Sequence, residues 1–105
     1  MTTAQERFGK GLGLYGQQKY EEGIAELTLA VESDPQFADA HLALGHTFHK
    51  LGRLPEAADA IGKAIALNGK EALYHTSLSM VYRDMGRISD AEEEMAISFE
   101  LQRGR

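Results

Sequence analysis

Residues 38–71 read ADAHLALGHTFHKLGRLPEAADAIGKAIALNGKE and form the middle copy of a unit that repeats every 34 residues. Columns of side chains of similar size link this copy to the segments before and after it. They are Gly11, Gly45 and Ser79; Leu14, Phe48 and Tyr82; Gly23, Ala57 and Ala91; Leu27, Ile61 and Met95; and Ala30, Ala64 and Ser98. A period of this length is typical of stacked repeat proteins. The sequence therefore predicts three copies, at about residues 4–37, 38–71 and 72–105.

Each copy has room for two helices and two short turns. The same connector, Leu-Gly-Arg-Leu or Met-Gly-Arg-Ile, occurs at residues 51–54 and 85–88. We therefore predict helices at about 4–17, 20–33, 38–51, 54–67, 72–85 and 88–101. The expected fold is all-α: a superhelical solenoid of three antiparallel helix-turn-helix repeats.

Residues that start and stop helices support these boundaries. We expect Gly52 and Gly86 to end helices in the left-handed conformation, which glycine adopts without steric cost. Pro55 suits a first helical position, where its missing N–H would have no partner. Ser89 and Glu92 match a capping box, and Asn68-Gly69 matches a left-handed helix end.

The small-residue columns predict where helices come close together. Gly45 and Ala57 lie one on each helix of the middle copy, so the two backbones can approach at the short end of the packing range. A larger side chain at Gly45 would force the helices apart. We therefore expect Gly45→Leu to destabilise the protein by overpacking.

This unit resembles the tetratricopeptide repeat, on residues found mainly in the middle copy: His41, Leu44-Gly45, Phe48, Ala57, Ile61 and Ala64. The first copy adds Pro35, and the third adds Leu78, Tyr82 and Ala91. The resemblance covers nearly the whole chain. It implies a non-enzymatic protein-interaction module whose first helices line a concave groove.

The composition indicates a small soluble domain and excludes several classes of function. The 105 residues are 43% hydrophobic and carry a net charge of -5, without the basic face that nucleic acid requires. No apolar run is long enough for a membrane span, and no secretory leader is recognisable. Cysteine is absent, which fits a reducing compartment. We expect a cytoplasmic protein that binds neither nucleic acid nor membrane.

A stripe of residues at helical spacing on the first helix of each copy is the candidate binding surface. It is apolar and aromatic for a surface, as binding sites often are. We expect it to take an extended, partly hydrophobic segment of a partner protein. Part of the stripe, at Phe8, Leu12 and Leu42, is as compatible with core as with groove. The predicted groove residues are Phe8, Leu12, Tyr15, Leu42, His46, His49, Leu73, Thr76, Met80 and Arg83, edged by Asp39, Ala43, Lys50 and Ser77.

One use of this family is not expected here. The members that grip acidic chaperone tails use a clamp of Lys, Asn and Arg side chains. At the matching positions this sequence has only apolar or small residues, which offer a carboxylate no charge-assisted hydrogen bond. These positions are Phe8, Leu12, Ala43, Leu73 and Ser77.

The alternative function uses the end of the stack. Ile97, Phe99 and Leu101 on the last helix are candidates for exposure, and could dock on a second copy to form a homodimer or on a larger subunit. The chain would then be a structural component of an assembly.

The first copy is irregular. Gly9, Gly11, Gly13 and Gly16 crowd its first helix, and glycine in a helix interior is less stable than alanine. Arg7 and Lys10 stand where His41 and Leu44 stand one copy later, which gives this end of the stack a polar face. We expect this helix to be the least stable of the six.

No pattern predicts catalysis, a cofactor or a metal site. Residues 11–16 match G-x-G-x-x-G but fall inside a predicted helix, without the preceding strand that dinucleotide binding needs. His46 and His49 are one turn apart, yet zinc needs further ligands, and His41 and His75 occupy positions inside the hairpins. We expect no enzyme activity.

Overall fold

The computed structural model describes residues 2–104 and has helices as its regular elements there. The predicted domain limits at residues 1 and 105 lie outside this range. All six helices begin where the repeat pattern predicts. The ends of α2 and α4 also match, and those of the other four helices differ from the prediction by one or two residues. They are α1 (Ala4–Gly16), α2 (Tyr20–Ser33), α3 (Ala38–Lys50), α4 (Leu54–Leu67), α5 (Ala72–Asp84) and α6 (Ile88–Arg103).

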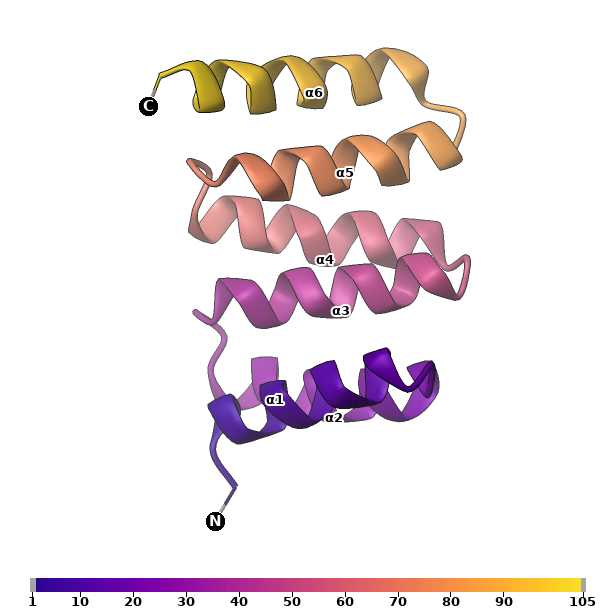
Figure 1. Cartoon of the computed structure of the whole chain (residues 1–105), viewed down its shortest axis with the longest axis vertical. Coiled ribbons are helices and arrows are strands. Elements are labelled where there is room, and N and C mark those ends of the chain that lie inside the picture. Colours follow the sequence, from indigo (N-terminus) through magenta and orange to yellow (C-terminus); the bar gives the residue numbers. More distant parts are fainter. Residues whose placement is uncertain (1, 105) are drawn as a thin grey trace.

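The helices form three antiparallel hairpins, α1–α2, α3–α4 and α5–α6, which stack in a row with the two chain ends at opposite ends of the stack (Figure 1). The stack measures 42 × 29 × 20 Å. Each hairpin packs on the next through α2 and α3 or through α4 and α5, and α3 also touches α1 and α5. The predicted all-α repeat solenoid is therefore confirmed, and its first helices share one face.

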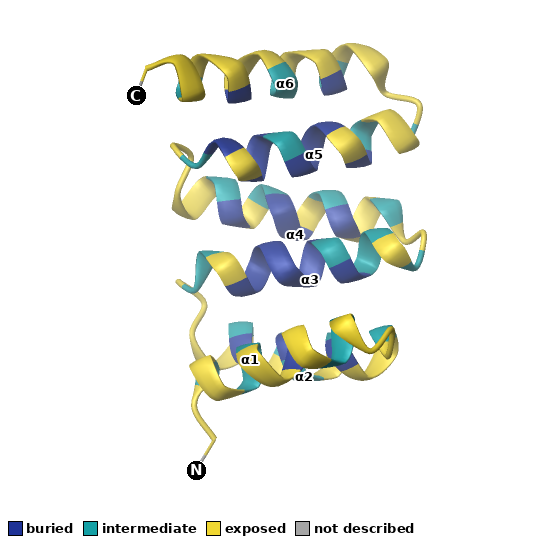
Figure 2. Ribbon diagram, in the orientation of Figure 1, coloured by how far each residue is buried: buried dark blue, intermediate teal, exposed yellow. Residues whose placement is uncertain are grey.

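The core follows the repeat columns. Leu27 and Ile61 have no exposed surface, and the same is true of Ala30 and Ala64. Two apolar clusters result, one between the first and second hairpins and one between the second and third. Buried residues face the neighbouring helices, whereas the outward side of α6 is exposed (Figure 2).

The glycine column marks the closest contacts between paired helices. A Cβ atom at Gly45 would lie 2.5 Å from Ile61 Cγ1 and 3.2 Å from the carbonyl oxygen of Ala57. One at Gly11 would lie 2.6 Å from Leu27 Cγ. The predicted close approach of the two helices in a hairpin is confirmed.

The turns within hairpins are left-handed in all three copies. Gly52 and Gly86 have φ of +74° and +80°, as predicted. Gln18, at the same place in the first copy, has φ of 62° although it carries a side chain. This left-handed residue was not among the predicted helix ends.

Two cap predictions are wrong. Ser89 lies inside α6, whose N-cap is Arg87 without a side-chain hydrogen bond, so there is no capping box with Glu92. Asn68 ends α4 with φ of -150°, and Gly69 is not left-handed. Because Asp34 ends α2 in a similar extended conformation, both connections between hairpins have one geometry. A capping box does join Thr3 and Glu6 at the start of α1.

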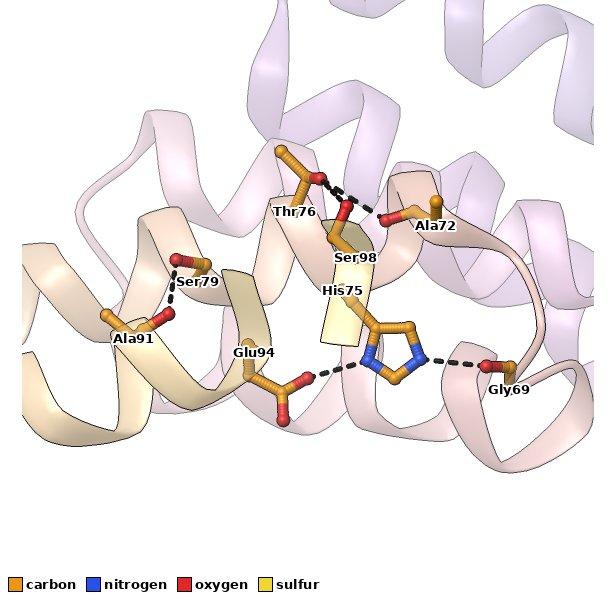
Figure 3. A network of polar contacts seen from close by, with 8 residues as sticks. All are labelled: Gly69, Ala72, His75, Thr76, Ser79, Ala91, Glu94 and Ser98. Carbon is orange, nitrogen blue, oxygen red and sulfur yellow. Dashed lines mark hydrogen bonds and ion pairs between the residues drawn. The ribbon is translucent and has the colours of Figure 1, made fainter. Parts of the chain in front are cut away.

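The third hairpin is held by polar contacts, which Figure 3 shows. The His75 ring lies between Glu94 Oε1, 2.8 Å from Nδ1, and the Gly69 carbonyl oxygen, 2.8 Å from Nε2. The hydroxyl group of Ser79 donates to the Ala91 carbonyl oxygen at 2.7 Å. Thr76 Oγ1 and Ser98 Oγ are also 2.7 Å apart. Hydrogen bonds therefore connect α5 to α6 where small and apolar residues connect α3 to α4.

Candidate functional site

Two adjoining pockets open on the face that α1, α3 and α5 share. The smaller pocket, of about 180 Å³, lies between α1 and α3. The larger, of about 500 Å³, extends from α3 across α5. Tyr15 and His46 line both pockets, so the two are parts of one groove that crosses all three hairpins.

The smaller pocket is mainly apolar. Its lining comes from one face of α1 and from the facing residues of α3, with Asp39 at its edge. Apolar walls of this kind suit a hydrophobic side chain, because burial there removes apolar surface from water. The lining residues are Phe8, Leu12, Tyr15, Asp39, Leu42, Ala43, His46 and Thr47.

The larger pocket is more polar. It combines two imidazoles and a lysine ammonium group with exposed apolar side chains from α5. Such a mixture provides contact area together with hydrogen-bonding groups. The lining residues are Tyr15, His46, His49, Lys50, Leu73, Thr76, Ser77 and Met80.

The structure brings together every predicted groove residue except Arg83, which is exposed on α5 and lines neither pocket. The four residues expected at the edge also line the pockets. Thr47 is an addition that sequence reasoning missed. Its side chain is fully buried and its hydroxyl group donates to the Ala43 carbonyl oxygen at 2.8 Å, so it belongs to the pocket floor.

The residues of the predicted stripe differ in how far their side chains are buried. Leu42 is 7% exposed and packs in the core, and the Phe8 ring packs on Phe37 with centroids 4.8 Å apart. By contrast, Leu12 is 45% exposed and Leu73 is 56% exposed. Of the three residues for which core and groove were equally compatible, Leu42 is therefore core, Phe8 is half-buried and Leu12 is open to solvent.

Both groove histidines bridge α3 to α5. His46 Nε2 is 2.9 Å from Ser77 Oγ, and His49 Nε2 is 2.6 Å from Asp84 Oδ2. Burial lowers the pKa of His46, and the nearby His49 lowers it further. Nε2 of each groove histidine thus already has a partner in the protein, and these two contacts connect the second and third hairpins.

A third bridge lies at the other end of the same helices. The Tyr74 hydroxyl group donates to Asp39 Oδ1 at 2.5 Å. Burial raises the pKa of Tyr74, and the hydrogen bond to the Asp39 carboxylate raises it further. The hydroxyl group is therefore a stable donor, and Asp39 is held at the edge of the smaller pocket.

Comparison with protein families decides the identity of the repeat. Residues 8–73 match the model of the tetratricopeptide repeat. The chain belongs to the tetratricopeptide repeat family. No curated protein matches this family member in sequence.

Solved structures of tetratricopeptide repeat proteins have the same fold. A crystal structure of MamA aligns with a TM-score of 0.94 at 20% identity, over 98% of this chain and 60% of that one. MamA (AMB-1) aligns with a TM-score of 0.90 at 27% identity, over 97% and 60%. The second repeat domain of Spaghetti (RPAP3), bound to the HSP90 peptide SRMEEVD, aligns with a TM-score of 0.91 at 20% identity, over 94% and 92%. The present repeat protein therefore spans about three fifths of MamA.

The far end of the stack also exposes apolar side chains. Phe99 is 62% exposed and Ile97 is 40% exposed, whereas Leu101 is half-buried. Ile88, at the start of α6, is 53% exposed and was not among the predicted end-face residues. The end face is thus centred on Ile88 and Phe99.

Side chains within residues 2–104 also bear on metal binding and membrane insertion. There the structure holds no group of three or more side chains suited to binding a metal ion. None of the helices in this range is both long and apolar enough to cross a membrane.

Proposed function

We propose that this tetratricopeptide repeat protein is a non-enzymatic interaction module that binds an extended, partly hydrophobic segment of a partner protein in the groove of α1, α3 and α5. The observation that carries the proposal is the pair of adjoining pockets that share Tyr15 and His46. An extended peptide crosses both, with an apolar side chain in the smaller pocket and backbone groups along the larger one.

The RPAP3 repeats support the general mode, because they are solved with a peptide bound. Their peptide, SRMEEVD, is acidic at its end. In this chain the positions of the acid-binding clamp are Phe8, Leu12, Ala43, Leu73 and Ser77, which line the two pockets without supplying a charge. We therefore propose a ligand anchored by apolar side chains rather than by a terminal carboxylate.

A display experiment tests this proposal without knowledge of the natural partner. The purified chain is used to select from a library of random linear peptides, and the enriched peptides are measured by fluorescence polarisation. We expect enrichment of segments with one or two large apolar residues. Leu12→Asp and Leu73→Asp should each weaken binding at least about tenfold, because an unpaired carboxylate in either pocket loses its hydration.

Leu29→Asp is the matched control. Leu29 lies on α2 outside both pockets, and its exposed fraction of 41% is similar to the 45% of Leu12. Its variant should bind the selected peptides as the wild type does. Equal affinity of the wild type and both groove variants would refute the proposed groove, and so would a library that yields no binding peptide.

A further inference from the structure

The outward face of α6 repeats the positions through which α2 and α4 pack on the next hairpin. Ile24 and Val31 of α2, and Ala58 and Ile65 of α4, are half-buried and belong to the clusters between hairpins. The residues one period later in α6 are Glu92 and Phe99, and both are exposed. We call Ile88, Glu92, Met95, Ala96 and Phe99 the α6 stacking face.

The opposite end of the molecule carries the complementary positions. α3 and α5 pack on the preceding hairpin, and five of the equivalent positions in α1 are exposed. The α1 stacking face consists of Glu6, Gly9, Lys10, Gly13 and Gln17. A Cβ atom at Gly9 or Gly13 would have nothing within 4 Å, so no other part of the protein covers the backbone at these two positions.

The internal interface between α4 and α5 shows how two such faces fit. The two helices are antiparallel across residues 68–71, so we expect residues at equal distance from that connection to face each other. Ile65 and Tyr74 are such a pair, and both belong to the cluster between the second and third hairpins. Ala58 and Val81 are the equivalent pair farther along, and both belong to the same cluster. The same pairing can be applied to α6 of one copy and α1 of another by shifting the residue numbers by whole periods. Phe99 then faces the turn of Glu6 and Gly9, and Glu92 faces the turn of Lys10 and Gly13.

The charges match in this arrangement. Glu92 replaces the apolar Ile24 and Ala58, and Lys10 replaces the apolar Leu44 and Leu78. Thus an opposite-charge pair takes the place that an apolar pair has inside the stack. Phe99, the larger successor of Val31 and Ile65, lies opposite the turn of Glu6 and Gly9, where Gly9 leaves room for its ring.

A symmetric pairing of two α6 faces fits poorly. Its exposed carboxylates are Glu92, Glu93 and Glu100, spread along the helix. A parallel pair sets Glu92 against Glu92, and an antiparallel pair centred on Ala96 sets Glu92 against Glu100. Like charges across an interface are repulsive in both cases.

We propose that copies of this chain stack head to tail, with the α6 stacking face of one copy covering the α1 stacking face of the next. The contact continues the repeat from one molecule to another and leaves the groove free. Because the two faces differ, the interface is heterologous and produces open-ended chains rather than closed dimers.

Sedimentation velocity from micromolar to millimolar protein tests the assembly. The weight-average mass should rise steadily with concentration and pass that of a dimer. Phe99→Glu blocks the α6 face and Gly13→Glu blocks the α1 face, and each should weaken association about tenfold or more. Ile97→Glu and Gly16→Glu are controls of equal charge, at exposed positions outside the stacking faces, and should associate as the wild type does.

A mixture of the two blocked variants tests whether the copies stack head to tail. Phe99→Glu retains a free α1 face and Gly13→Glu retains a free α6 face, so a mixture should form a one-to-one pair although neither variant assembles by itself. Lys10→Glu should weaken association, and adding Glu92→Lys to it should restore open-ended assembly, because the two charges are exchanged and opposite charges again face each other. Three results would overturn the proposal: a wild type that stays monomeric throughout, a wild type that stops at a dimer, or a mixture that stays monomeric.

Discussion

Gln18 occupies the left-handed position that Gly52 occupies in the next hairpin, with φ of 62° against +74°. The two residues are 34 apart, and each lies in the turn between the paired helices of its copy. A residue with a Cβ atom is strained in this region, at a cost of about 1–2 kcal/mol. The first hairpin therefore contains a strained turn that the other two avoid.

Replacement of Gln18 by glycine should relieve that strain. We expect Gln18→Gly to raise the free energy of unfolding by about 1 kcal/mol, measured by urea denaturation. Gln17→Gly is the control, because Gln17 has a φ of -86° and gains nothing from glycine. A gain of equal size in both variants would contradict the strain argument.

The period of the sequence predicted most of the fold because it records which positions face a neighbouring helix. Columns such as Leu27 and Ile61 identified the core, and helical spacing identified nearly all the groove lining. The residues that cap the helices were harder to predict from the repeat pattern. Ser89 matched a capping pattern, yet the start of α6 is set by the preceding turn, whose geometry is shared with α4 and places Arg87 at the N-cap.

The polar contacts between α3 and α5 could not be predicted from the sequence. His46 and Ser77 are 31 residues apart, and His49 and Asp84 are 35 apart, so neither pair follows the period. Their contacts depend on how far one hairpin is shifted along the next, which a one-dimensional pattern does not record. The strain at Gln18 had a signal, because the same column holds Gly52 and Gly86.

The hydrogen bond between His75 and Glu94 should contribute to the stability of the third hairpin. The two side chains are 7% and 18% exposed, and the Arg7–Glu26 pair takes the same two places in the first copy. Glu94→Ala leaves the buried imidazole without this partner and should cost about 1–3 kcal/mol in urea denaturation. Glu93→Ala removes an exposed carboxylate next to it and should change stability by less than about 0.5 kcal/mol. Equal losses would show that the pair has no special role.

Close packing at Gly45 predicts a large effect of a single methyl group. Gly45→Ala would place its Cβ atom against Ile61 and the Ala57 carbonyl oxygen, so α3 and α4 must move apart. We expect a loss of about 1–3 kcal/mol in thermal or urea unfolding. Gly62→Ala adds the same methyl group to α4 in open space and should gain about 0.5–1 kcal/mol. A neutral Gly45→Ala variant would contradict this packing.

The first helix should open more readily than the others. Three of its glycines, Gly9, Gly13 and Gly16, are exposed, and a Cβ atom at any of them would meet nothing within 4 Å, so no close approach offsets their backbone entropy. We expect faster amide hydrogen exchange in α1 than in α3, and slower exchange in α1 after Gly9→Ala, measured below the concentration at which the chain associates. Slower exchange in wild-type α1 than in α3 would refute this expectation.

The lowered pKa of His46 predicts a pH-dependent stability. In the unfolded chain this imidazole takes up a proton near its ordinary pKa of 6.5, whereas the folded protein resists protonation because the ring is buried. The unfolded state therefore binds more protons as the pH falls below 6.5, and the free energy of unfolding should decrease until the pH reaches the lowered pKa of the folded state. His46→Gln keeps a hydrogen-bonding group near Ser77 but cannot titrate, so its melting temperature should fall less between pH 7.5 and pH 5. Equal slopes for the two proteins over this range would show that His46 is not the group responsible.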